Sequence, residues 1–188
     1  GDDKIDFAYF VTAHELAHQW WAHQVLGGDG QGATMFSEGL AEYSALTVME
    51  KRYGPEAAQK FLRRELDGYL QGRSVERKKE VPLLYVENQP YIHYRKGSLV
   101  FYALRDYIGE TAMNDALHAF VEKWQFKGPP YPTARDLYAE LGGLALAEPV
   151  DYAQPHQIRV GPHHDLGRRH ARDEHVVPSP PMDRRLRH

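Results

Sequence analysis

The chain has 188 residues, of which 42% are apolar and 26% charged, and its formal net charge is -3. This composition is that of one globular domain rather than a disordered chain, and the charge gives no argument for nucleic acid or an anionic membrane as a partner. The absence of cysteine excludes disulfides and thiolate metal ligands. The sequence contains no run of about 18 apolar residues, the length needed to span a bilayer. We therefore expect a soluble chain without membrane contact of its own.

The first predicted helix runs from Ile5 to about Leu26, where apolar residues recur at helical spacing without Gly or Pro. It contains an H-E-x-x-H pattern at residues 14–18. Positions four apart lie about one turn apart on one helix face, so His14 and His18 can bind the same metal ion. Glu15 points about 100° round the helix, where it can polarise a water on the metal without being a ligand. The pattern predicts one Zn²⁺ per chain, and a catalytic zinc site needs a third protein ligand.

A second helix is predicted from Phe36 or Ser37 to Tyr53, after a glycine-rich turn at residues 27–32. It places Glu38 in its first turn, and Glu38 is our candidate for the third metal ligand. Glu42, one turn on, is either a hydrogen-bond acceptor for a ligand imidazole or a solvated side chain, and we favour the solvated position. The alternative for the whole pattern is an amphipathic helix with two histidines by chance. Its weakness is the apolar surroundings, which suit an unpaired Glu15 poorly.

The remaining elements up to residue 146 are also predicted to be helical. The helices span Pro55 to about Gly72, Lys96 to about Ile108, Glu110 or Thr111 to Trp124, and Ala134 to Leu141. The polar side of the first of these, which includes Glu65, is expected to face solvent. Residues 81–90 contain two prolines and are expected to be extended, so that they deliver Tyr94 towards the site. The predicted fold class is all-α.

The character of the sequence changes after about Leu146. Residues 147–188 lose helical periodicity, contain no lysine and hold six histidines. Apart from one adjacent pair, these histidines keep no ligand-like spacing. We therefore predict a disordered tail rather than a metal-binding one.

Two stretches of the sequence resemble a known family. They are His14-Glu15-x-x-His18 and Ser37-Glu38-Gly39-Leu40-Ala41-x-Tyr43. Together they resemble the gluzincin zinc aminopeptidases, the family of membrane alanine aminopeptidase and leukotriene-A hydrolase. One residue more than is usual in that family separates His18 from Glu38, across a glycine-rich turn that can absorb it. The resemblance implies that residues 1–146 are part of a zinc metallopeptidase catalytic domain, the helical lobe of a thermolysin-like fold.

A further match lies at Tyr91-Ile92-His93-Tyr94-Arg95-Lys96-Gly97. In this family a Tyr before a charged residue, Lys and Gly donates a hydrogen bond to the oxyanion of the tetrahedral intermediate, which implies that role for Tyr94. A neutral phenol, with a reference pKa of about 10, can donate to an oxyanion at neutral pH. By residue type alone, Tyr94 is one of 12 tyrosines and would be a half-buried side chain at a helix start.

The function that follows is zinc-dependent hydrolysis of a peptide substrate, with Glu15 as general base, and most simply an aminopeptidase. The family's Gly-x-Met-Glu-Asn strand, which binds the substrate amino terminus, does not occur in the residues before His14, so we expect a piece of a larger enzyme. A bacterial branch that joins such a domain to transporter-like membrane segments makes a membrane-associated parent protein a further expectation, and the compartment stays open. The alternatives are a zinc endopeptidase or epoxide-type hydrolase, and a catalytically incompetent fragment or helical binding module that keeps the zinc site.

Overall fold

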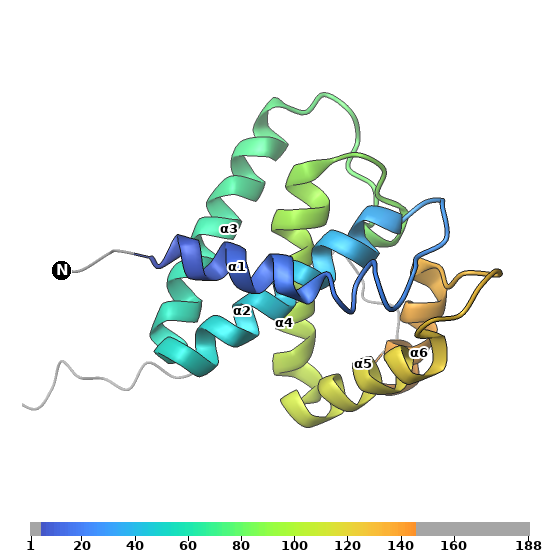
Figure 1. Cartoon of the computed structure of the whole chain (residues 1–188). Helices are drawn as coiled ribbons and strands as arrows, with labels where there is room; N and C mark the ends of the chain where they lie inside the picture. The colour runs from blue at the N-terminus through green and yellow to red at the C-terminus, as the bar shows by residue number, and fades with distance from the viewer. Residues whose placement is uncertain (1–4, 146–188) are drawn as a thin grey trace, which may run out of the picture. The chain divides into compact units, whose positions relative to one another are not determined.

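A computed structural model of the chain describes residues 5–145, and the tail predicted at residues 147–188 lies outside the described residues. The α-helices are α1 (Phe7–Ala17), α2 (Leu40–Tyr53), α3 (Pro55–Val75), α4 (Gly97–Ile108), α5 (Glu110–Trp124) and α6 (Ala134–Ala145). Three short turns separate them: the π-helical turns η1 (Met35–Gly39) and η3 (Tyr91–Lys96), and the 3₁₀ turn η2 (Leu83–Tyr85). Residues 5–145 contain no strand (Figure 1), so the prediction of an all-α fold is confirmed.

The predicted helix boundaries hold where glycine and proline punctuate the chain. Gly54 ends α2 with a φ of 86°, a conformation that favours glycine, and Pro55 then occupies the first turn of α3. Gly109, with a φ of 95°, separates α4 from α5 in the same way. At α6 the prediction was wrong, because the helix continues through Gly142 to Ala145. A glycine inside a helix costs only about 1 kcal/mol relative to alanine, which does not by itself end the helix.

The first helix is much shorter than predicted. It ends at Ala17 instead of Leu26, and Ala22 has a φ of 118° in the turns that follow. Trp21 and Val25 keep a four-residue spacing, but they reach the interior from this irregular segment, where they are 5% and 0% exposed. For Trp21 and Val25 the apolar spacing was therefore a correct signal of burial and a wrong signal of helix.

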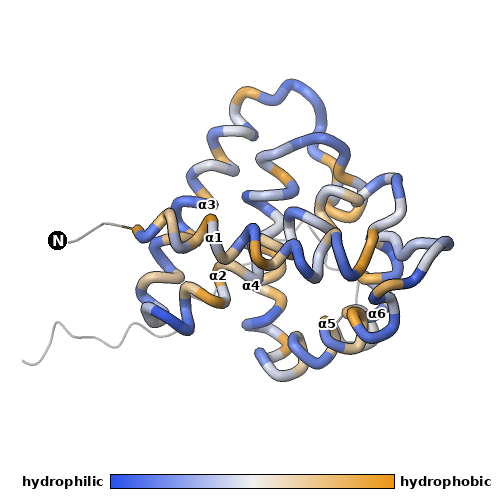
Figure 2. Tube along the Cα trace, in the orientation of Figure 1, coloured by the Kyte–Doolittle hydropathy of each residue, from blue (hydrophilic) through white to orange (hydrophobic). Residues whose placement is uncertain are grey.

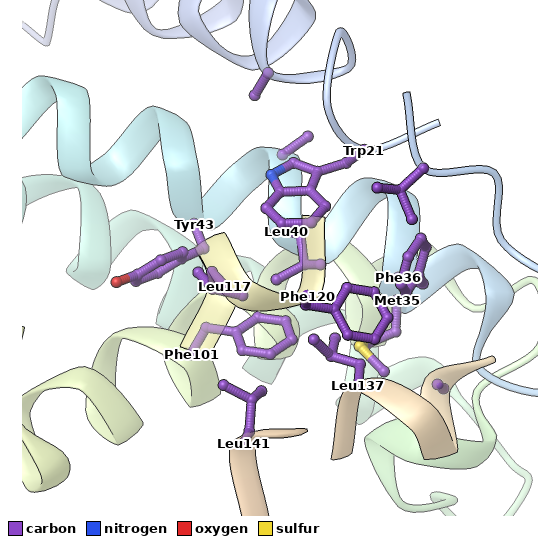
Figure 3. Packing of buried hydrophobic residues seen from close by; sticks show 14 of the residues in the cluster. Trp21, Met35, Phe36, Leu40, Tyr43, Phe101, Leu117, Phe120, Leu137 and Leu141 are labelled. Carbon is purple, nitrogen blue, oxygen red and sulfur yellow. The ribbon is translucent and has the colours of Figure 1, made fainter. Parts of the chain in front are cut away.

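The interior consists of two apolar clusters. The larger one joins the segment after α1 to η1, α2, α4, α5 and α6. Figure 3 shows Phe36 near Phe120 in this cluster, and their ring centroids are 5.6 Å apart. The smaller one joins α1, α2, α3 and α4, where the rings of Phe10 and Phe61 stack at 4.3 Å. Figure 2 shows hydrophobic residues along α1 and α2 and mostly hydrophilic ones on the outer turns of α3. No helix of residues 5–145 has the length and apolar content needed to cross a membrane.

Two glycines allow the starts of α2 and α4 to approach closely. A Cβ atom on Gly97 would lie 3.3 Å from the Cα of Gly39, and a Cβ on Gly39 would lie 3.1 Å from the carbonyl oxygen of His93. Both distances are tighter than ordinary contacts, so larger residues would push the two segments apart. Because Glu38 and Tyr94 flank this crossing in the sequence, the close approach brings them to one place.

Candidate metal centre

The three predicted metal ligands converge although they come from two separate segments. His14 lies in the last turn of α1, His18 is the residue at its C-terminal cap, and Glu38 lies in η1 just before α2. Helix α1 packs on α2, as Figure 1 shows. The Nε2 atoms of His14 and His18 are 3.2 Å apart, and Glu38 Oε2 is 3.2 Å from the first and 3.5 Å from the second.

This triangle of atoms has the size that a tetrahedral zinc ion requires. With zinc–ligand bonds of about 2.0–2.1 Å, two ligand atoms of a tetrahedron lie about 3.3 Å apart. Two imidazole nitrogens that both present lone pairs at 3.2 Å repel each other unless a cation or a proton lies between them. Among the described residues, His14, His18 and Glu38 form a group whose ligand atoms all lie within 4.8 Å of one another, close enough to hold one metal ion.

The end of α1 at His18 orients that imidazole. The carbonyl group of Trp21 lies outside the helix, and its oxygen is 2.9 Å from His18 Nδ1. In the tautomer that has its proton on Nδ1, the ring donates to this carbonyl and leaves Nε2 as an acceptor directed at Glu38 and His14. A hydrogen bond of this kind on the far nitrogen is what usually fixes a metal-binding histidine.

His14 has a carboxylate on its far side as well. Glu42 Oε2 lies 3.8 Å from His14 Nδ1, beyond hydrogen-bond distance, and both atoms are buried without a hydrogen-bond partner among the described residues. Glu42 is only 8% exposed, so our preference for a solvated position was wrong. The helix period explains this burial, because Glu42 in α2 follows Glu38 in η1 by about one turn and lies on the same side of the chain there.

The carboxylates make this site favourable for positive charge. Burial lowers the pKa of His14, but Glu38 and Glu42 outweigh it and raise that pKa to about 9. The hydrogen bond with His14 in turn holds the pKa of Glu38 below its usual value. The same negative charges that favour a proton on His14 would favour a divalent cation between the ligand atoms, so the residues present fit a zinc ion.

The two predicted catalytic side chains lie beside the triad. The Tyr94 hydroxyl hydrogen-bonds Glu38, and its ring centroid is 6.0 Å from that of His14. Burial, the hydrogen bond to Glu38 and the charges of Glu38, Glu42 and Glu15 raise the pKa of Tyr94 to about 12, so its phenol is protonated at neutral pH. Glu15 itself is exposed on the outer face of α1.

Both Glu38 and Tyr94 lie in π-helical turns, one in η1 and the other in η3. Single π turns within helices are often found at functional sites. These π turns were not predicted, since apolar periodicity does not distinguish a π turn from an α turn. A cavity of about 320 Å³ adjoins Tyr94 and is lined by Glu42, Gly68, Pro90, Tyr91, Tyr94 and Arg95.

The structure adds residues that the sequence interpretation did not place at the site. Glu65, expected on a solvated helix face, is 1% exposed and forms an ion pair with Arg95, the residue after Tyr94. His93, the residue before Tyr94, is buried, and burial lowers its pKa. The available signal for Glu65 was its spacing from two glycines of the same helix, Gly68 and Gly72.

An H-E-x-x-H helix packed against a second helix that supplies a glutamate defines a metallopeptidase of the gluzincin class. The sequence matches the model of the Peptidase family M1 domain over residues 3–150, and the chain belongs to this family. The resemblance noted in the sequence is thereby confirmed.

Among the relatives is the human Endoplasmic reticulum aminopeptidase 2, which is 24% identical over 150 residues that make up 72% of this chain and 14% of the human protein. Solved relatives include an M1 zinc metallopeptidase mutant from Deinococcus radiodurans bound to a Tyr-Ser-Ala substrate, with a TM-score of 0.56 and 26% identity. A two-domain M1 zinc metallopeptidase mutant bound to L-tryptophan has a TM-score of 0.55 and 27% identity. In both comparisons 72% of this chain matches 29% of the solved chain, so the chain spans a minor part of its relatives.

Proposed function

We propose that this chain provides the metal-binding and catalytic helices of a zinc-dependent peptide hydrolase of the aminopeptidase type. The observation on which the proposal rests is the triangle of His14 Nε2, His18 Nε2 and Glu38 Oε2, with sides of 3.2, 3.2 and 3.5 Å. The family's zinc chemistry and the peptide bound to the Deinococcus relative support a peptide as substrate.

In this proposal His14, His18 and Glu38 hold the metal, and each imidazole has an acceptor on the side of its far nitrogen. Trp21 accepts from His18 Nδ1 at 2.9 Å, and Glu42 Oε2 lies 3.8 Å from His14 Nδ1. Bound zinc would supply Lewis acidity, which acidifies water and polarises the scissile carbonyl.

Glu15 acts as the general base. It follows His14 on α1, and its charge contributes to the raised pKa of Tyr94. An exposed carboxylate is ionised at neutral pH and can accept a proton from the attacking water. It then returns that proton to the leaving amine.

Tyr94 donates a hydrogen bond to the oxygen of the scissile carbonyl as negative charge develops on it. The phenol is well suited to this, because a pKa of about 12 keeps its proton in place at neutral pH. In the present structure the hydroxyl donates to Glu38. The substrate oxygen must therefore replace Glu38 as the acceptor when it enters the site.

The test combines metal content with specificity. Elemental analysis of the purified chain is expected to give about one zinc ion per molecule, and zinc-loaded protein should hydrolyse peptides with a free amino terminus faster than the same peptides with a blocked one. Equal rates on free and blocked peptides would indicate an endopeptidase instead. A chain that takes up no zinc after dialysis against the metal would contradict the proposal.

A further inference from the structure

The π turn that contains Tyr94 is seated on one face of α3. Glu65, Gly68 and Gly72 follow one another at intervals of three and four residues, so they lie on the same side of this helix. Each of them meets η3 directly. This face of α3, defined here by these three residues, is distinct from the α1 and α2 surfaces that supply the metal ligands.

The two glycines allow η3 to lie against the α3 backbone. A Cβ on Gly72 would lie 2.4 Å from the Cβ of Tyr91, a distance that real side chains do not adopt. A Cβ on Gly68 would lie 3.1 Å from Arg95 Nε. A side chain at Gly72 would therefore displace Tyr91 at the start of the turn that holds Tyr94, and a side chain at Gly68 would push against the Arg95 side chain.

Glu65 fixes the same turn by charge. One guanidinium nitrogen of Arg95, Nη1, donates to both carboxylate oxygens of Glu65, at 2.6 and 2.8 Å. Glu65 is 1% exposed, and a buried carboxylate is tolerated only when its partner stays in place. The next residue, Lys96, is paired with Glu80, which also accepts a hydrogen bond from Tyr69 of α3. The two residues that follow Tyr94 are thus both held by ion pairs.

We propose that the α3 face formed by Glu65, Gly68 and Gly72 positions the Tyr94 hydroxyl at the metal centre. Glu65 is a positioning residue, because it touches Arg95 and not the metal ligands. The inference rests on the proposed role of Tyr94 as oxyanion donor. It adds that the geometry of this donor is set by α3, through contacts that leave the metal ligands unaffected.

The main test is a double-mutant cycle between Glu65→Gln and Tyr94→Phe in the full chain loaded with zinc. Glutamine keeps the shape of Glu65 but removes its charge, so Arg95 loses its partner and the turn loosens. We expect Glu65→Gln to lower kcat roughly 10- to 100-fold, as misplacement of a catalytic group does, with unchanged KM and zinc content. In the Tyr94→Phe background the same substitution should cost almost nothing, because the group that it positions is already absent.

Gly68→Ala is a second variant that does not depend on a buried charge. Alanine has a higher helix propensity than glycine, so the melting temperature should not fall, whereas displacement of Arg95 should lower kcat. Asp67→Ala is the matched control, since Asp67 is the exposed neighbour on the same helix. It should leave kcat unchanged. If Glu65→Gln does not fold, Gly68→Ala combined with Tyr94→Phe completes the same cycle.

Several results would overturn the inference. Equal losses from Glu65→Gln in the parent and in the Tyr94→Phe background would mean that Glu65 acts independently of Tyr94. A higher KM at constant kcat in Gly68→Ala would assign this face to substrate binding in the adjoining cavity. Unchanged kcat in Tyr94→Phe itself would contradict the proposed role of Tyr94, and the inference would fail with it. If Tyr94→Phe strongly lowers kcat but the losses from Glu65→Gln and Tyr94→Phe are additive, only the inference about α3 fails.

Discussion

The metal triad and the Tyr94 turn are neighbours in space but are built by different means. His14 and His18 are four residues apart around one helix turn, and Glu38 follows at the start of the helix that packs on it. Tyr94 lies far from the ligands in the sequence, and it is held near them by the close contact of Gly39 with Gly97 and by the ion pair of Arg95 with Glu65. Local spacing thus encodes the ligands, whereas the position of the tyrosine depends on tertiary packing. Substitutions should therefore separate metal binding from turnover.

Removal of a metal ligand should have the largest effect, because catalysis by Tyr94 and Glu15 depends on the bound metal. His14→Ala leaves two ligands and is expected to abolish both zinc binding and turnover. Elemental analysis after dialysis against zinc measures the first, and peptide hydrolysis the second. His118→Ala on α5, where the side chain is 73% exposed, is the control and should keep full zinc content. A His14→Ala protein with one zinc ion per chain would show that the metal is bound elsewhere.

Glu15→Gln should separate the two properties. The amide cannot accept the proton of water, so turnover should fall by roughly 10²- to 10⁴-fold, the contribution of general base catalysis. Zinc content should not change, because Glu15 is not within the group of ligand atoms. The exposed Glu122 provides the control substitution Glu122→Gln. Normal turnover in Glu15→Gln would exclude Glu15 as the base.

Tyr94→Phe removes the catalytic hydroxyl of the Tyr94 turn and leaves the metal triad intact. Loss of one oxyanion donor costs roughly 10²- to 10³-fold in kcat, and zinc affinity should be unchanged. Steady-state kinetics on the zinc-loaded variant, with zinc affinity measured in parallel, would check both expectations. A loss of zinc in this variant would indicate that the hydrogen bond from Tyr94 to Glu38 is needed for metal binding.

The difference between the two halves also explains what the sequence could predict. The positions of His14, His18 and Glu38 follow from helix period and from glycine and proline punctuation, and the structure brings all three together. The early end of α1 was missed because no glycine or proline marks it: Gln19 and Trp20 already donate to carbonyls three residues back, and Ala22 then takes a positive φ. Glu65 was missed because the spacing of Gly68 and Gly72 can indicate a closely packed helix face but not the partner, Arg95, 30 residues away, on which the burial of this carboxylate depends.

The smallest expected effect concerns the support of His14, and it tests how far the metal half extends beyond its ligands. Glu42 Oε2 lies 3.8 Å from His14 Nδ1, the ring nitrogen opposite the one that contacts Glu38. Removal of such a partner typically weakens metal binding by about 10- to 100-fold. We therefore expect that loss for Glu42→Ala, measured as zinc affinity by competition with a chelator. Glu42→Gln should lose less, because an amide oxygen can still accept from the imidazole. If both variants bind zinc as tightly as the parent, the metal half of the site is complete with its three ligands, and His14 needs no support from α2.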